Sequence, residues 1–224
     1  MAVVLYALIW TCIETVRVDG DSMQNTLQNG DFLIASKISY MVGNPARGDI
    51  VILQPPHTCD ATSADYIKRV VGLPGDRLRI EDGQVYVNGA LLEEPYATFE
   101  PAPPNQFRDN FPARVYTNPE VDPDWWRQMQ SLTHNGELVV PEGQYFVLGD
   151  NRNHSEDSRF WGFVPRQAIV ARPLVIYFSI SRPSTTDVQP VAQQASDDRL
   201  GHERELAVRF YGFARWNRIF RIVH

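Results

Sequence analysis

Hydrophobic residues recur along most of this chain in short runs that turn residues bound on both sides, a pattern typical of β-strands. The dipeptides Asp82-Gly83 and Asn88-Gly89 separate such runs, and both of their positions tolerate the positive φ that tight hairpin turns need. The pattern therefore predicts a mainly β protein built from antiparallel strands. The predicted strands are Phe32–Ile38, Ile50–Leu53, Tyr66–Leu73, Leu78–Ile80, Gln84–Val87, Tyr145–Leu148 and Leu174–Ile180.

The N-terminus differs from this pattern because residues Ala2 to Ile13 are almost entirely apolar, and Glu14 and Arg17 end the run. A helix of this length spans about 18 Å, less than the roughly 30 Å of a bilayer's hydrocarbon core. A buried helix and a signal-peptide core are the alternatives, although no cation precedes the run and no small-x-small site follows it. We interpret residues 1–15 as a transmembrane anchor helix whose start is expected upstream of Met1.

Composition divides the remaining chain into segments. Proline, phenylalanine, tryptophan and asparagine are concentrated between residues 93 and 140, which we interpret as a smaller inserted β-rich lobe. A short helix is predicted there, where Asp122 can cap and Pro123 can open the sequence "DWWRQMQSL". The larger antiparallel β domain then takes residues 16–92 and 141–183, and the polar residues 184–205 are expected to form a mobile loop.

The C-terminal segment 206–224 is expected to return to the larger β domain or to a membrane surface. The segment from Arg199 onward contains six arginines but only two glutamates, and aromatic and aliphatic residues are interspersed among them. Such a pattern is typical of segments that lie on anionic membranes, but it also suits a closing strand with a solvated basic face.

Overall composition limits the possible functions. A chain of 224 residues with 43% hydrophobic content can bury a sizeable core. Its net charge of −6 argues against a nucleic-acid partner, because such binding requires neutralisation of phosphates by Lys and Arg. Cys12 and Cys59 have no metal-type spacing, so we expect two free thiols without a catalytic role, and neither a metal nor a cofactor.

A serine and a lysine are the first candidates for chemistry. Ser22 lies in the turn "GDSMQNTL", and Lys68 lies in "DYIKRVVGLPGD", an apolar strand that two adjacent cations open. If Arg69 points to water, strand alternation directs Lys68 inward, where loss of solvation lowers the pKa of the amine and leaves a base for a serine hydroxyl. Each motif also has a simpler interpretation. Ser22 would then lie in an ordinary polar turn, and Lys68 would be an edge-strand lysine that discourages aggregation.

A third motif, "GDNRNHSEDSRFWG", concentrates hydrogen-bonding side chains between two apolar segments. A calcium loop of the EF-hand type is excluded because the sixth position, Ser155 when counted from Asp150, is not the required glycine. A serine triad through His154 stays open at this point, since it needs only an acid that orients the imidazole ring.

Taken in order, "GDSMQNTL", "RGDIVIL", "YIKRVVGLPGD" and "GDNRNHSEDSRFWGFVP" resemble the sequence boxes of bacterial type I signal peptidases, also called leader peptidases. The resemblance covers the chain from about Val16 to Ile180, and the ending "WNRIFRIVH" is similar to the C-terminus of that family. It implies a membrane-bound serine endopeptidase with an antiparallel β catalytic domain and a smaller inserted β domain. Its substrates would be secretory preproteins, cleaved after small-x-small sites.

The resemblance also assigns roles to individual residues. Ser22 resembles the nucleophile and Lys68 the general base, while Ser155 resembles the hydroxyl that holds the lysine amine. Met23 resembles the residue that packs near the cleavage pocket.

Asp157 and Arg159 resemble an ion pair that shapes the site from beneath. The chain departs from the family pattern at two positions: Asn25 stands where proline is frequent, and Gly20 stands where some members have a serine that donates to the oxyanion.

The resemblance implies a protein of the bacterial cytoplasmic membrane, with membrane lipid as a partner and the catalytic domain on the outer side. Two other functions stay open at the level of sequence. One is a self-cleaving Ser-Lys relative, and the other is a non-catalytic β domain that binds extended peptides at a sheet edge.

Overall fold

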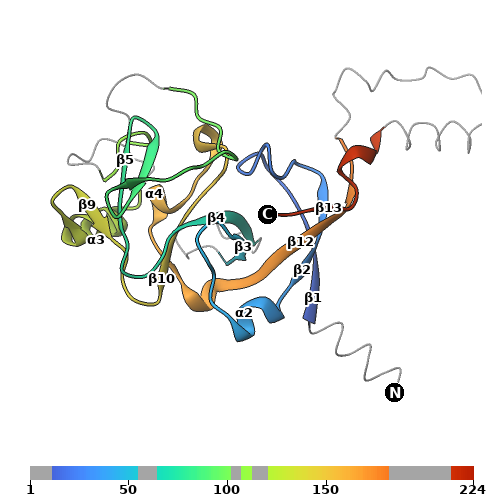
Figure 1. Cartoon of the computed structure of the whole chain (residues 1–224), viewed down its shortest axis with the longest axis horizontal. Helices are drawn as coiled ribbons and strands as arrows, with labels where there is room; N and C mark the ends of the chain where they lie inside the picture. Colours follow the sequence, from blue (N-terminus) through green and yellow to red (C-terminus); the bar gives the residue numbers. More distant parts are fainter. Residues whose placement is uncertain (1–11, 55–64, 102–106, 113–120, 182–212) are drawn as a thin grey trace, which may run out of the picture.

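The computed structural model describes residues 12–54, 65–101, 107–112, 121–181 and 213–224, which form two antiparallel sheets and a few short helices (Figure 1). The larger sheet has eight strands in the order β1-β2-β12-β3-β4-β10-β11, with β13 paired to β12. Its strands are β1 (Ile13–Arg17), β2 (Asp31–Ser36), β3 (Ile50–Leu53), β4 (Tyr66–Gly72), β10 (Gln144–Leu148), β11 (Val164–Pro165), β12 (Ile169–Ser179) and β13 (Arg221–Ile222).

The smaller sheet has five strands in the order β7-β6-β5-β9-β8. They are β5 (Arg77–Glu81), β6 (Gln84–Val87), β7 (Ala90–Leu91), β8 (Thr133–His134) and β9 (Glu137–Val139). The chain therefore enters this sheet at Arg77, whereas the inserted lobe was predicted to start at residue 93. Apolar side chains of both sheets, such as Val71 of β4 and Leu78 of β5, belong to one buried cluster, so the smaller sheet shares its core with the larger one.

The predicted strands are present with small shifts of their ends. β3 and β6 begin and end at the predicted residues, while β12 begins five residues before the predicted start at Leu174. Asp82, Gly83, Asn88 and Gly89 all have positive φ, as the hairpin dipeptides require.

The predicted helix is α3 (Pro123–Leu132), and the Asp122 side chain accepts a hydrogen bond of 2.7 Å from the Trp125 N–H, as expected of an N-cap. The remaining short helices are α2 (Ile38–Val42), α4 (Ser158–Trp161), η1 (Arg152–His154), η2 (Arg166–Ala168) and η3 (Trp216–Arg218).

Part of the segment predicted as an anchor helix is a β-strand. Ile13 begins β1, which pairs with β2 from Ile13 opposite Ser36 to Arg17 opposite Phe32, so residues 13–15 belong to the sheet. Residues 1–11 and the expected mobile loop 184–205 lie outside the described residues. Within the described segments, the structure has no helix with the length and hydropathy needed to cross a bilayer.

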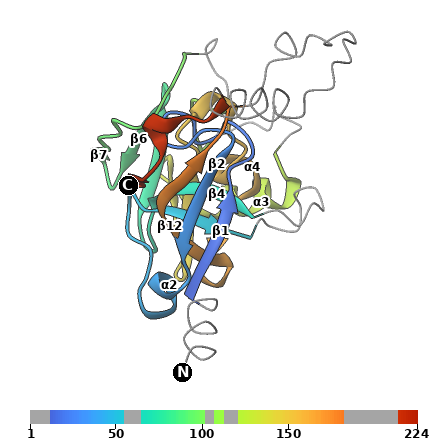
Figure 2. The same cartoon turned by 90° about the vertical axis from the view of Figure 1, so that its right-hand side faces the viewer.

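A buried carboxylate joins the C-terminal segment to the larger sheet. Asp31 at the start of β2 is fully buried, and it accepts hydrogen bonds from Ser179 Oγ at 2.6 Å and from Arg218 Nη2 at 2.6 Å. Burial alone would raise the pKa of this carboxyl group, but Arg218 and Ser179 outweigh it and hold the pKa below its usual value. β13 pairs with β12 beside this contact, and Figure 2 shows β12 lying alongside β2 and β1.

Candidate active site

The candidate nucleophile and the candidate base are in direct contact. Lys68 Nζ lies 2.8 Å from Ser22 Oγ, within hydrogen-bond distance. Ser22 comes from the turn between β1 and β2, and Lys68 comes from β4, so the fold joins two residues that are 46 positions apart. This pairing matches the sequence prediction.

The position of Lys68 within the sheet explains the state of its amine. β4 lies between β3 and β10, with Lys68 opposite Val51, and the side chain is only 5% exposed. Burial lowers the pKa of Lys68 to about 8, although the carboxylates of Asp157 and Glu156 favour the charged form. A substantial fraction of this amine is therefore neutral near pH 8, and a neutral amine can accept a proton.

The turn that carries Ser22 is fixed from its own side and from the opposite loop. Within the turn, Gln24 N–H donates to the Asp21 carbonyl at 3.0 Å, and Leu27 N–H donates to the Met23 carbonyl at 2.8 Å. From the loop after β10, Asn151 N–H donates to the Ser22 carbonyl at 3.0 Å. The hydroxyl oxygen of Ser22 is thus presented by a backbone that is bonded on both sides.

Both departures from the family pattern lie at unusual backbone positions. Asn25 has φ of 89°, which proline cannot adopt because its ring fixes φ near −65°. Gly20 has φ of 106°, and a Cβ at this position would meet no atom within 4 Å. Space therefore does not exclude a serine at position 20, but the backbone conformation does favour glycine.

The condition that Arg69 points to water is not met, because Arg69 is buried. Arg69 is 3% exposed and forms a bidentate pair with Asp150, with Nε to Oδ1 at 2.8 Å and Nη2 to Oδ2 at 2.7 Å. Asp150 also accepts a hydrogen bond of 2.6 Å from Thr26 Oγ1, and the Tyr96 ring lies 3.8 Å from the guanidinium carbon. Alternation along β4 does place Lys68 and Arg69 on opposite faces, but both faces of this strand are covered.

Asp157 and Arg159 form the predicted ion pair. The two side chains are almost completely buried and meet in two contacts of 2.8 Å, Arg159 Nε with Asp157 Oδ1 and Nη2 with Oδ2. Burial alone would raise the pKa of Asp157, but the Arg159 guanidinium and the Gly149 N–H hydrogen bond outweigh it and keep the pKa low. The ion pair therefore supports the strand end at Gly149 from beneath.

Gly149 is a site residue that the sequence analysis missed. A Cβ at this position would lie 2.2 Å from Ser155 Oγ and 2.5 Å from the Ser22 carbonyl oxygen, so only a hydrogen atom fits between the two serines. Ser155 Oγ is buried and has no hydrogen-bond partner among the described residues. Its predicted contact with the amine of Lys68 is therefore not among the hydrogen bonds of this structure.

The two reactive groups lie in an open cleft of about 500 Å³. Ser22, Met23 and Lys68 line it, and Met23 is 2% exposed and packs into the core. His154 also lines the cleft, but its ring is exposed and forms no hydrogen bond with the described residues. The group bonded to Ser22 Oγ is thus the Lys68 amine, and the described residues show no hydrogen bond between His154 and Ser22.

Other chemistry has little basis in the described part of the chain. No group of three or more His, Cys, Asp or Glu side chains there could hold a metal ion. Cys12 does not line the cleft, and Cys59 lies outside the described residues.

A serine hydroxyl that contacts a buried amine of lowered pKa is the arrangement of an enzyme that transfers acyl groups through a serine nucleophile. Residues 1–178 match the model of the family described as signal peptidase, peptidase S26. The chain belongs to this family, and it is a serine endopeptidase of the signal peptidase I type.

Named relatives support the assignment. The chain is 38% identical over 184 residues to a probable signal peptidase I-2 of Synechocystis sp., covering 81% of this chain and 71% of that protein. It is 36% identical to a signal peptidase I of Leptolyngbya laminosa, covering 81% of this chain and 77% of the relative. A crystal structure of a signal peptidase I from Enterococcus faecalis V583 is 30% identical and gives a TM-score of 0.42, covering 58% of this chain and 97% of the other.

The lowered pKa of Lys68 predicts the pH dependence of cleavage. A protonated amine cannot accept the serine proton, so kcat/KM for a precursor peptide should rise with pH through about 8 and level off above it. Glu156→Gln should move this midpoint to lower pH, because its carboxylate stabilises the charged lysine. The exposed Glu142→Gln, outside the cleft, should leave the midpoint unchanged. Loss of the pH-dependent limb in His154→Ala would contradict the assignment of the base.

Gly149→Ala should greatly reduce cleavage, because the added Cβ would collide with Ser155 and with the Ser22 carbonyl. A displacement of the nucleophile by about 1 Å can cost roughly 100-fold in rate, and we expect a loss of that order in kcat/KM. Gly43→Ala, at the end of α2, is the control and should cleave normally. If Gly149→Ala folds, as judged by its thermal unfolding midpoint, and cleaves at the wild-type rate, the proposed close fit is wrong.

Proposed function

We propose that Ser22 attacks the carbonyl carbon of the scissile peptide bond while Lys68 Nζ takes the proton from Oγ. Lys68 then gives this proton to the leaving amine, and a water molecule releases the acyl group from Ser22. The 2.8 Å contact between Nζ and Oγ is the observation that carries the proposal. The burial of Lys68 supports it, because an exposed lysine would be almost fully protonated at neutral pH.

The substrates are preproteins that carry signal peptides, as membership of the signal peptidase I family implies. We propose that cleavage follows small residues at positions −3 and −1. Val16, Val18, Met23 and Ile67 contribute apolar side chains to the cleft beside Ser22, and such walls would exclude larger substrate side chains by steric contact. The oxyanion would be bound by backbone N–H groups, including that of Ser22, because Gly20 offers no hydroxyl.

Ser155 is proposed to position the amine of Lys68. An ammonium group has three donors, but among the described residues the Lys68 amine is hydrogen-bonded only to Ser22, and the buried hydroxyl of Ser155 has no hydrogen-bond partner there. A small rotation that joins Ser155 and Lys68 would satisfy both groups.

Substitution of the two reactive residues tests this mechanism. Ser22→Ala and Lys68→Ala should each lower kcat for precursor cleavage by at least about 1,000-fold, as the loss of a nucleophile or its base does in other serine proteases. Ser131→Ala, an exposed serine on α3, and His154→Ala should remain active. Cleavage that survives either of the first two substitutions would exclude the dyad, and a wild-type protein that binds precursors without cleaving them would favour the peptide-binding alternative.

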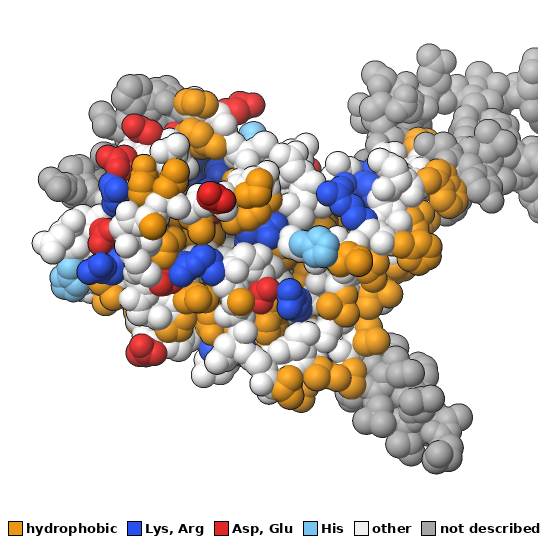
Figure 3. Space-filling view, in the orientation of Figure 1, with side chains coloured by type: hydrophobic (Ala, Val, Ile, Leu, Met, Phe, Trp, Pro, Cys, Tyr) orange, Lys and Arg blue, Asp and Glu red, His pale blue; other side chains and the backbone are white. Residues whose placement is uncertain are grey.

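We also propose that the protein acts at the outer side of a bacterial cytoplasmic membrane. Exposed apolar side chains occur on β1, α2, β12, β13 and the segment before β13, and Figure 3 shows hydrophobic groups on the right-hand side of the molecule. We call this surface the apolar rim. It comprises Ile13, Ile38, Met41, Val42, Leu174, Trp216, Phe220 and Ile222.

The position of the apolar rim supports this proposal. The rim includes the first residue of β1, which continues directly from the apolar N-terminal run, and Lys37 N–H donates to the Cys12 carbonyl at 2.9 Å beside α2. Trp216 and Phe220 are 54% and 78% exposed, an unfavourable state in water that contact with the lipid interface would relieve. A signal peptide that lies in the bilayer would then meet the cleft near the membrane surface.

The variant Trp216→Ser/Phe220→Ser tests the membrane contact. It should lose about tenfold in cleavage of a precursor embedded in vesicles, because the lost apolar transfer is worth on the order of 1–2 kcal/mol. Cleavage of a short soluble peptide should be unchanged. Leu91→Ser, which exposes a polar group at a similarly exposed position on β7, is the matched control. Equal losses on both substrates, or no loss on either, would contradict the membrane role of the rim.

A further inference from the structure

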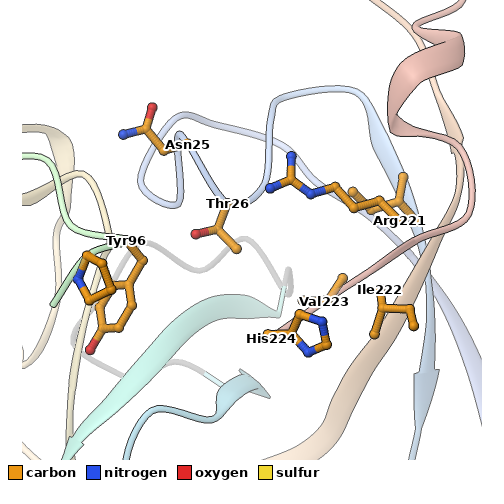
Figure 4. A pocket seen from close by; sticks show the side chains of 9 residues that line it. Asn25, Thr26, Tyr96, Arg221, Ile222, Val223 and His224 are labelled. Carbon is orange, nitrogen blue, oxygen red and sulfur yellow. The ribbon is translucent and has the colours of Figure 1, made fainter.

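A second cavity lies on the other side of the turn that carries the nucleophile. Its volume is about 450 Å³, within the range of sites that hold small ligands. Figure 4 shows Asn25 and Thr26 of the turn along its upper side, with Tyr96 opposite Arg221, Ile222, Val223 and His224. None of the described residues lines both this cavity and the catalytic cleft.

Arg221 is the unusual group in this cavity. Every other Lys or Arg side chain of the described segments bonds to a carboxylate, a hydroxyl, an amide or a backbone carbonyl. The Arg221 side chain has no hydrogen bond or ion pair within the described part of the chain. In Figure 4 its guanidinium extends along the cavity towards Thr26. A guanidinium that the protein leaves unpaired at a cavity wall is available to a ligand anion.

The other polar groups of the cavity are partly committed to the protein. Thr26 Oγ1 donates to Asp150, the hydroxyl of Tyr96 donates to Glu94 at 3.3 Å, and the main-chain oxygen of His224 accepts from Arg69 at 3.1 Å. The carboxylate of Asp150 is itself neutralised by Arg69. The group that remains for a ligand is the Arg221 guanidinium; in Figure 4 the His224 ring lies below it, and the Asn25 amide lies beyond Thr26.

The rest of the lining is apolar. Pro95, Ile176, Ile222 and Val223 contribute aliphatic surface, and the Tyr96 ring adds an aromatic face. A guanidinium at one wall and apolar surface at the others match a molecule with one anionic group and a hydrocarbon body. A carboxylate fits the guanidinium best, because its two oxygens accept from the planar fork in a bidentate manner.

We propose that this cavity is a binding site for an amphiphilic monoanion, a carboxylate with a medium-length aliphatic chain, held by Arg221. The site goes beyond the proposed peptidase function, because it shares no lining residue with the cleft and requires neither Ser22 nor Lys68. A ligand there contacts Asn25 and Thr26, which follow the nucleophile in the same turn.

Isothermal titration with three matched probes tests the site. Octanoate supplies both the anion and the chain, octanol supplies the chain alone, and acetate supplies the anion alone. Wild-type protein should bind octanoate at least tenfold more tightly than either partial probe. Arg221→Gln should lose at least tenfold in octanoate affinity, whereas Arg127→Gln, which removes a 75% exposed arginine on α3, should bind normally.

The same titration separates this inference from the catalytic proposal. Ser22→Ala should bind octanoate with the wild-type affinity, whatever its effect on cleavage. Equal thermal unfolding midpoints of Arg221→Gln and wild type in the absence of ligand would show that the variant is folded. The proposal is overturned if octanoate does not bind, if octanol binds equally well, or if folded Arg221→Gln keeps the wild-type affinity.

Discussion

The chemistry of this protein depends on the loss of water around one amine. Lys68 lies on β4, which is flanked by β3 and β10 in the larger sheet. Its charged form is poorly solvated there, and its nitrogen contacts the hydroxyl of Ser22. The nearby carboxylates of Asp157 and Glu156 oppose this effect, so the pKa is lowered only to about 8. The balance is useful, because a base with a pKa near the working pH both accepts and returns a proton readily.

Two buried ion pairs hold the backbone around this amine. Arg69 with Asp150 lies on the face of β4 opposite Lys68, and Asp157 with Arg159 lies beneath Gly149. Buried pairs add little net stability, but removal of one partner costs about 3–5 kcal/mol because the other charge is left unpaired. Their contribution here is geometric, since their hydrogen bonds fix the strand ends and the turn from which the reactive groups extend.

Much of this arrangement could be predicted from the sequence, and the rest depended on tertiary contacts. Alternating apolar runs and Asp-Gly or Asn-Gly turns indicated β3, β6 and the hairpin between β5 and β6, because these elements are set by local preferences. Ser22 and Lys68 stood out as a possible pair only once several motifs were considered together. The burial of Arg69 was not foreseen, because alternation along a strand indicates the face on which a side chain lies but not what packs against that face. Gly149 was missed because its importance lies in a contact with residues distant along the chain.

The buried contacts of the Asp31 carboxylate affect the order in which the chain can fold during synthesis. Its partners Arg215 and Arg218 lie among the last residues described, and Val223 completes the smaller apolar cluster around Met23. While those residues are still inside the ribosome, folding of β2 would bury the Asp31 carboxylate before Arg215 and Arg218 are available to pair with it. The half of the sheet that bears Ser22 therefore cannot reach its final packing until Arg215, Arg218 and Val223 have left the ribosome, so the site is completed only after this segment has been made.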